Sequence, residues 1–197
     1  MTAVGYSRRI DQALLYAHDL HRTQTRKGGG VPYFVHLLAV AALVGDHGGD
    51  EDQVIAALLH DAVEDQGGDR TAAEIERRFG RRVAQIVLSC SDSRETPRPP
   101  WRERKERFLQ HLPNAPEDAL LVVLADKVHN ACALVRDLES EGARVWSRFH
   151  GGRDGTLWYY REVTQILRAR TTSPLVRTLQ HLVSRLETLA HKTDAQL

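Results

Sequence analysis

Apolar residues recur every three or four positions along most of this chain, the spacing that places them on one face of an α-helix. The pattern predicts helices over the segments 10–20, 37–44, 52–63, 71–79, 82–88, 101–112, 116–138, 157–168 and 174–190. No segment shows a convincing alternation of apolar and polar residues, which is the pattern of a half-buried strand. The sequence therefore predicts an all-α fold, a compact multi-helix bundle.

Polar and glycine residues mark where these helices begin and end. Asp50 or Asp52 stands at the start of one helix, and Thr71 with Glu74 three residues later has the form of a capping box. Gly80 is a break between two neighbouring helices. The predicted connections are glycine- or proline-rich and lie at 28–30, 48–49, 67–68, 92–100 and 151–152.

Length and composition narrow the class of protein. A chain of 197 residues can form one domain with a complete core, so we expect a single domain over 1–197. Lys and Arg number 27 against 26 Asp and Glu, and this balance argues against nucleic acid or a membrane as a partner. No signal-peptide core and no stretch of 18 apolar residues is present. Two cysteines are too few for a disulfide scaffold, so we expect a cytoplasmic protein.

Four ionisable groups interrupt the otherwise apolar segment 56–65. On a continuous helix, His60, Asp61, Glu64 and Asp65 would fall within an arc of about 140°, so one face would carry an imidazole and three carboxylates. Crowded carboxylates repel one another unless a cation lies among them. The segment therefore predicts a cation site.

A second polar interruption lies in the most apolar segment, 116–138. Asp126 follows a run of apolar residues, and Asn130 is one helical turn further on the same face. An unpaired aspartate is costly to bury, so Asp126 should meet a basic side chain or a metal ion. By itself the residue is equally consistent with an ion pair to a buried arginine.

The third chemical feature is a basic, glycine-rich loop at 25–36 that leads into a helix. Arg26 and Lys27 lie in the loop, and His36 stands where the helix begins. A lone histidine at such a position is more often a hydrogen-bonded core residue than a ligand. His36 is therefore a candidate ligand only in combination with the other two features.

The order His36, His60–Asp61, Asp126 supplies two imidazoles and two carboxylates in the sequence pattern His…His-Asp…Asp. This set resembles that of the HD superfamily of metal-dependent phosphohydrolases, and the resemblance implies that all four residues hold one divalent ion. Mixed nitrogen and oxygen ligands without a thiolate suit manganese, iron or zinc, and suit calcium poorly.

The segments 26–36, 60–65 and 124–130 narrow the resemblance to the hydrolase domain of the RelA/SpoT alarmone enzymes, over roughly residues 10–140. That family includes small stand-alone hydrolases, among them animal SpoT homologues. The resemblance implies a Mn²⁺-dependent enzyme that removes the 3′-pyrophosphate of guanosine or adenosine alarmones of the stringent response, (p)ppGpp or (p)ppApp. The products would be GDP or GTP, or ADP or ATP, with pyrophosphate. The helices over 155–192 would pack onto this domain.

The resemblance also implies roles for residues beyond the metal ligands. Glu64 and Asp65 correspond to the acidic pair that orients and activates the attacking water. Arg26 corresponds to an arginine over the substrate, where Lys27 adds a second charge for phosphate, and Asn130 to a residue that hydrogen-bonds the nucleotide sugar. A carboxylate one turn from the ligands could accept the proton of the water.

Departures from the family pattern leave the substrate open. The chain has Leu37 where proline is usual, Gln66 where threonine is frequent, and Ala133 where a hydroxyl residue is often found. One alternative is an HD phosphohydrolase acting on another nucleotide, such as the 2′-phosphate of NADPH, a deoxynucleotide or a nucleoside monophosphate. The other is a non-catalytic alarmone-binding module. A homo-oligomer is left open.

Two further regions carry residues with two interpretations. The aromatic residues 158–160 could stack on a base, but packing in the core is the favoured interpretation. Lys105 could reach a substrate phosphate, but a solvated helix face is the favoured interpretation there.

Overall fold

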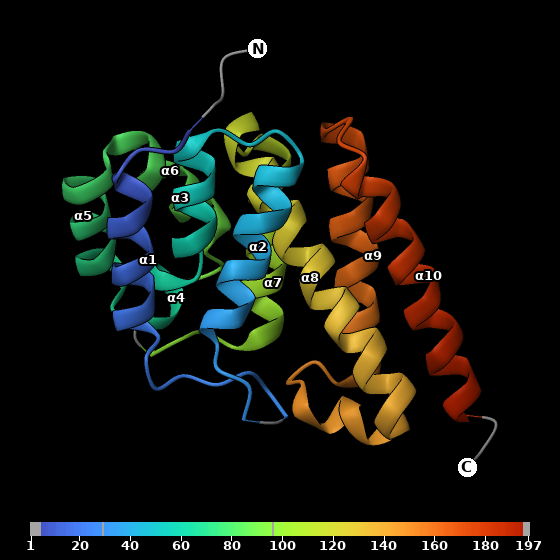
Figure 1. Cartoon of the computed structure of the whole chain (residues 1–197). Coiled ribbons are helices and arrows are strands. Elements are labelled where there is room, and N and C mark those ends of the chain that lie inside the picture. The colour runs from blue at the N-terminus through green and yellow to red at the C-terminus, as the bar shows by residue number, and fades with distance from the viewer. Residues whose placement is uncertain (1–4, 29, 96, 195–197) are drawn as a thin grey trace.

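The computed structural model of the chain describes residues 5–28, 30–95 and 97–194 (Figure 1). The α-helices are α1 (Arg9–Leu20), α2 (Phe34–Asp46), α3 (Glu51–Leu59), α4 (Ala62–Asp65), α5 (Gly68–Phe79), α6 (Arg81–Cys90), α7 (Trp101–His111), α8 (Glu117–Glu141), α9 (Gly152–Arg170) and α10 (Leu175–Asp194). Two 3₁₀ helices, η1 (Leu112–Asn114) and η2 (Gly142–Arg148), complete the set. The described residues form no strand, so the predicted all-α fold is confirmed.

Three predicted features extend beyond the described residues. The glycine loop at 28–30 includes residue 29, and the proline-rich connection at 92–100 includes residue 96. The expected domain, 1–197, includes both chain ends, of which residues 1–4 and 195–197 lie outside the description.

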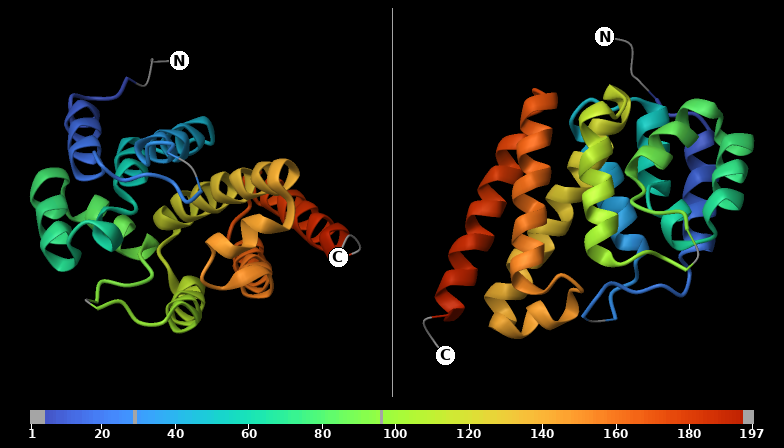
Figure 2. Two further views of the ribbon diagram at one scale, coloured as in Figure 1. Left: turned by 90° about the horizontal axis from the view of Figure 1, so that it is seen from below. Right: turned by 180° about the vertical axis from the view of Figure 1, so that it is seen from behind.

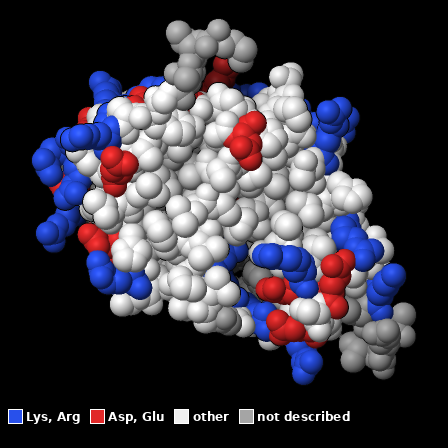
Figure 3. All heavy atoms as spheres, in the orientation of Figure 1, with Lys and Arg blue, Asp and Glu red and all other residues white. Residues whose placement is uncertain are grey.

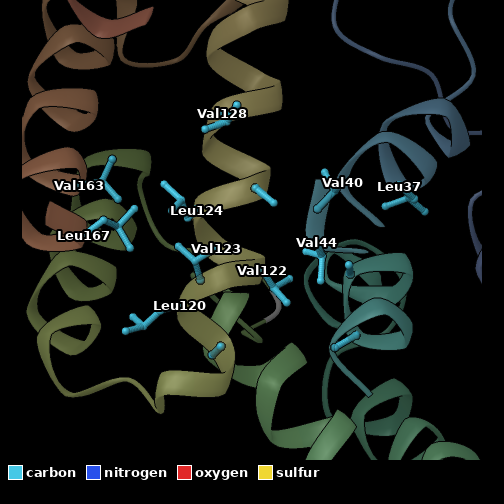
Figure 4. Packing of buried hydrophobic residues seen from close by; sticks show 14 of the residues in the cluster. Leu37, Val40, Val44, Leu120, Val122, Val123, Leu124, Val128, Val163 and Leu167 are labelled. Atoms are coloured by element: carbon cyan, nitrogen blue, oxygen red, sulfur yellow. The ribbon is translucent and has the colours of Figure 1, made fainter. Parts of the chain in front are cut away.

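The long helix α8 lies at the centre of the molecule. It packs against α2, α3 and α6 on one side and against α9 and α10 on the other (Figure 2). Val122 faces Val44 of α2, whereas Leu124 faces Leu167 of α9 (Figure 4). A helix with buried apolar residues on more than one face must be covered from several sides. Asp126, in the middle of α8, therefore lies within reach of residues of the N-terminal helices.

The predicted continuous helix over 52–63 is wrong at its end. Helix α3 stops at Leu59, and a new short helix, α4, begins after Asp61. The ring Nδ1 of His60 bonds to the carbonyl oxygen of Ala57, 2.8 Å away. A continuous helix would use that carbonyl for the N–H of Asp61. The side chain thus competes with the backbone, and the break turns His60 and Asp61 towards the centre of the molecule.

The other predicted helix limits have mixed outcomes. Asp50 starts α3 through a reciprocal pair of hydrogen bonds with Gln53, and Gly80, with φ +91°, separates α5 from α6, as predicted. The capping box predicted at Thr71 is wrong, because α5 begins at Gly68. Gly68 adopts a positive φ of 58°, which glycine tolerates and which lets the helix start one turn earlier.

Charged side chains are unevenly spread over the surface. On the face seen in Figure 3, they gather towards the edges, and the centre carries few. Exposed apolar side chains of α1 and α2 include Leu15, Val35 and Leu38. Among the described helices, none combines the length and the apolar character needed to span a bilayer.

Candidate metal centre

Three separate parts of the chain bring the four predicted ligands together. His36 lies in the first turn of α2, His60 and Asp61 lie between α3 and α4, and Asp126 lies in the middle of α8. The Nε2 of His36 is 3.2 Å from Oδ1 of Asp126 and 3.5 Å from Oδ2 of Asp61. The Nε2 of His60 is 3.5 Å and 3.0 Å from the same two oxygens. Two imidazole nitrogens and two carboxylate oxygens thus converge on one point.

The burial of this cluster fits a bound cation. His36 and His60 are each 1% exposed, and the Nε2 atom of each lacks a hydrogen-bond partner. Buried polar atoms without a partner are rare because they carry the full cost of lost hydration. One ligand atom each from His36, His60 and Asp126 lies within 4.8 Å of the others, and Asp61 adjoins them. These residues fit a divalent ion with mixed nitrogen and oxygen ligands.

The electrostatics of the cluster keep both carboxylates ionised. Burial would raise the pKa of Asp126, but the neighbouring Lys127 ammonium and the two imidazoles hold it well below its usual range. Burial likewise opposes ionisation of Asp61, and His60 and His36 reverse the effect, so its pKa is also well below the usual range. Ionised carboxylates and unprotonated imidazole nitrogens are the forms that bind metal ions.

Further side chains hold the two ligand aspartates in place, and two of these side chains were not predicted from the sequence. Tyr33 donates its hydroxyl hydrogen to Oδ2 of Asp61 at 2.5 Å, and Lys127 donates to Oδ2 of Asp126 at 2.6 Å. Asn130 also donates to Asp126. Contacts of this kind orient metal ligands. The only signal in the sequence was that Tyr33 and Lys127 stand near predicted ligands.

His129 also contacts this cluster. Its Nδ1 lies 2.7 Å from Nδ1 of His36, and the two ring centres are 4.8 Å apart. Burial, together with His36 and Arg26, lowers the pKa of His129 to about 4. His129 stands three residues after Asp126, a spacing that shares a helix face.

Glu64 and Asp65 lie in α4, directly after the ligands, and are mostly buried. Glu64 accepts a hydrogen bond from the backbone N–H of Asp92 at 3.3 Å, and Asp65 accepts from Gln24 at 2.7 Å. Arg98 pairs with Asp65 at 2.8 Å and lies 3.6 Å from Glu64. Burial, together with the like charge of Asp92, raises the pKa of Glu64 to about 7. A carboxyl group with this pKa can bind or release a proton near neutral pH.

The favoured interpretation of Lys105 as part of a solvated helix face is wrong. Its ammonium lies 2.7 Å from Asp92, whose side chain is 3% exposed, and Arg104 reaches both oxygens of Asp92 at 2.6 Å. Arg104 also approaches Glu64 at 3.5 Å. Helix periodicity does not reveal which charged face meets another element, so this pairing could not be predicted from the sequence.

Two of the predicted substrate residues, Arg26 and Asn130, contact each other. Arg26 donates to the amide oxygen of Asn130 at 2.8 Å, and its guanidinium lies 5.7 Å from the centre of the Tyr33 ring. The ammonium of Lys27 lies 5.5 Å from the centre of the Phe149 ring. Asn130 thus links Arg26 to Asp126 through the two ends of its amide group.

A single cavity of about 610 Å³ connects these groups. Its lining includes all the predicted site residues except His60, and adds charged and aromatic side chains that were not predicted. Tyr159 and Tyr160 line it but are 6% and 7% exposed, so the packing interpretation of the aromatic segment is the better one for these two rings. The cavity is large enough for a small molecule and is lined by both signs of charge.

In a comparison with known protein families, residues 13–157 match the HD domain model. Relatives in animals include the guanosine-3′,5′-bis(diphosphate) 3′-pyrophosphohydrolase MESH1 of Xenopus tropicalis, which is 38% identical over 70% of this chain and 74% of its own. The human MESH1 is 34% identical over 87% of this chain and 90% of its own.

The chain is also similar to a bacterial relative and to solved structures. The bifunctional (p)ppGpp synthase/hydrolase SpoT of Escherichia coli is 35% identical over 62% of this chain, which corresponds to 18% of SpoT. A solved structure described as a metazoan ortholog of SpoT that hydrolyzes ppGpp superposes with a TM-score of 0.76 and 28% identity, over 93% of this chain and 98% of that one. A Listeria monocytogenes protein superposes with a TM-score of 0.66 and 30% identity, over 80% of this chain and 99% of that one.

Proposed function

Because this chain belongs to the HD-domain family, we propose that it is a phosphohydrolase that removes the 3′-pyrophosphate of ppGpp and related alarmones. The proposal is carried by one observation: two histidines and two aspartates converge beside an acidic pair in a cavity that basic side chains also line. The relatives named for the same reaction cover most of the chain, and their resemblance to it, expected from the sequence, is confirmed.

The proposed cofactor is one divalent ion, Mn²⁺, held by His36, His60, Asp61 and Asp126. The mixed nitrogen and oxygen donor set supports manganese, and it also suits iron or zinc. When bound, such an ion polarises a phosphoryl oxygen and increases the acidity of water. The unpartnered Nε2 atoms of the two histidines support this assignment.

Glu64 is the proposed general base. Its raised pKa, about 7, means that the ionised and protonated forms are both populated near neutral pH. In the ionised form, Glu64 accepts a proton from water as water attacks phosphorus; the bond from phosphorus to the ribose 3′-oxygen breaks, and this oxygen takes up a proton from solvent to become the 3′-hydroxyl. Asp65, held by Gln24 and Arg98, orients the same water by accepting a hydrogen bond.

Basic side chains of the cavity would bind the phosphates. Arg26 can exchange its hydrogen bond to Asn130 for a bidentate contact to a phosphate group, and Asn130 is then free to bond the nucleotide sugar. Burial and the nearby Lys105 and Arg104 lower the pKa of Lys27, and an incoming phosphate would relieve this repulsion. These four side chains are among the Lys and Arg residues that line the cavity, and such a positive lining matches a substrate that carries several phosphate charges.

A turnover assay tests the proposal. Purified protein with Mn²⁺ is incubated with ppGpp, pppGpp, ppApp or NADPH, and the products are separated by ion-exchange chromatography. The proposal predicts pyrophosphate with GDP, GTP or ADP, and no turnover by Asp126→Asn. The exposed Asp69→Asn variant is the matched control and keeps the activity of the unmodified protein. Release of inorganic phosphate from NADPH alone would reassign the substrate.

We also infer that the protein works in a reducing compartment, the cytoplasm. Cys90 and Cys132 are both free thiols. Cys132 is exposed on α8, and exposed free thiols persist where glutathione keeps them reduced.

A further inference from the structure

The buried ligand His36 makes one hydrogen bond through its second ring nitrogen, and the partner is another histidine. Nδ1 of His36 lies 2.7 Å from Nδ1 of His129. His36 is buried at the start of α2, whereas His129 lies on α8 and lines the cavity. A hydrogen bond between two nitrogens at this distance contains one hydrogen, so one ring donates and the other accepts.

The position of the other ring nitrogen decides which ring donates. Nε2 of His36 faces the oxygens of Asp126 and Asp61 at 3.2 and 3.5 Å, in the place where a cation fits. To bind a cation, Nε2 must carry no hydrogen, so the hydrogen of the neutral ring is on Nδ1. His36 therefore donates and His129 accepts, and His129 carries its own hydrogen on Nε2.

We propose that His129 is a positioning residue that fixes the tautomer and the orientation of the metal ligand His36. The inference rests on the metal site of the proposed function. His60 supports the same logic, because its Nδ1 donates to the carbonyl oxygen of Ala57 at 2.8 Å. Each ligand histidine is thus held by one acceptor opposite its metal-facing nitrogen.

The hydrogen bond between His36 and His129 also links two helices that supply metal ligands. His36 sits on α2 and Asp126 on α8, so the geometry of the ligand set depends on how these two helices lie relative to each other. His129 lies one turn from Asp126 on the same helix and bonds a ligand on the other helix. The bond therefore fixes the ligand of α2 to the helix that supplies the ligand of α8.

Two substitutions separate an acceptor from a ring that only packs. His129→Phe keeps a flat ring of similar size but offers no acceptor. His129→Asn loses the ring but places an amide oxygen where Nδ1 stood, so it can still accept. A merely structural role predicts that His129→Phe is the milder change, whereas the positioning role predicts the reverse.

The affinity for the metal ion alone is the measurement. Metal-free protein is titrated with Mn²⁺, and the free ion is followed by electron paramagnetic resonance. His129→Phe should weaken Mn²⁺ binding about 10- to 100-fold, and His129→Asn should stay within about threefold of the unmodified protein. His181→Phe, at an exposed histidine of α10, is the matched control and should bind as the unmodified protein does. An unchanged affinity in His129→Phe overturns the proposal.

A second measurement needs no variant, so it remains decisive if His129→Phe fails to fold. In ¹⁵N-histidine-labelled protein loaded with diamagnetic Zn²⁺, the proposal predicts a scalar coupling between the two Nδ1 nitrogens across the hydrogen bond. The shared hydrogen should be covalently attached to His36. A hydrogen on Nε2 of His36, or on Nδ1 of His129, overturns the proposal. Neither measurement involves turnover, so a protein that binds metal but leaves ppGpp intact would refute the proposed function only.

Discussion

Replacing Glu64 with glutamine removes a carboxylate whose ionisation the fold opposes. Burial and the nearby Asp92 raise the pKa of Glu64 to about 7, compared with 4.5 for an unperturbed glutamate. At about 1.4 kcal/mol for each tenfold change in an ionisation constant, this difference corresponds to about 3 kcal/mol. Between pH 4.5 and 7 the folded state holds this proton more tightly than the unfolded state, so the stability contributed by protonated Glu64 is lost as pH rises through that window.

Glu64→Gln cannot ionise and therefore cannot lose this contribution. The free energy of unfolding of the variant minus that of the unmodified protein should rise by about 3 kcal/mol between about pH 4 and about pH 8. Contacts that the substitution changes equally at all pH values cancel from this change. Glu64→Gln also removes the proposed general base. The variant should therefore be more stable at high pH, relative to the unmodified protein, and should have lost activity.

Urea unfolding followed by tryptophan fluorescence measures the difference. The experiment uses metal-free protein with a chelator present, because a bound cation would favour ionised Glu64. The matched control, Glu76→Gln, removes an exposed carboxylate of α5 and shows how a glutamate-to-glutamine change affects the curve without burial. A difference between Glu64→Gln and the unmodified protein that stays constant across this pH range would refute the reasoning.

Three other substitutions test the packing and charge pairing around the cavity. Asp92→Asn leaves the buried ends of Arg104 and Lys105 without their shared counter-charge and should cost about 3–5 kcal/mol in urea unfolding; a loss below about 1 kcal/mol contradicts the pairing. Gly28→Ala forces a side chain onto a residue with φ +92° and against the guanidinium of Arg148, so it should raise KM for ppGpp in steady-state kinetics more than it lowers kcat. Leu124→Ala opens a cavity at the centre of α8 and should lower the free energy of unfolding by about 2–5 kcal/mol; a smaller loss would mean that α9 closes the space.

Most helices could be predicted because their signal is local. The apolar positions of α8 repeat at helical spacing, and Asp50 carries its capping partner three residues away. The all-α fold followed from these patterns. The assembly of His36 with Asp126 could not follow from spacing, because ninety residues separate them, and it came instead from the order of motifs that resembles a known family.

The features that the sequence missed depend on contacts between elements. The break after α3 arises because the ring of His60 takes the carbonyl of Ala57, a choice that helix periodicity does not encode. From its sequence pattern, Lys105 belongs to a solvated helix face. In the structure it pairs with Asp92, which lies thirteen residues earlier in the chain. His129 is next to Asn130 in sequence, but its partner lies on another helix. Such partners become visible only when the helices are placed.

Hydrolysis of ppGpp in ¹⁸O-labelled water tests the central claim most directly. Purified protein loaded with Mn²⁺ should release GDP and pyrophosphate, with one ¹⁸O atom in the pyrophosphate and none in GDP, because water attacks phosphorus and the bond to the ribose 3′-oxygen breaks. Intact ppGpp after incubation with protein whose metal site is shown to be filled, or ¹⁸O found in GDP, would contradict the account.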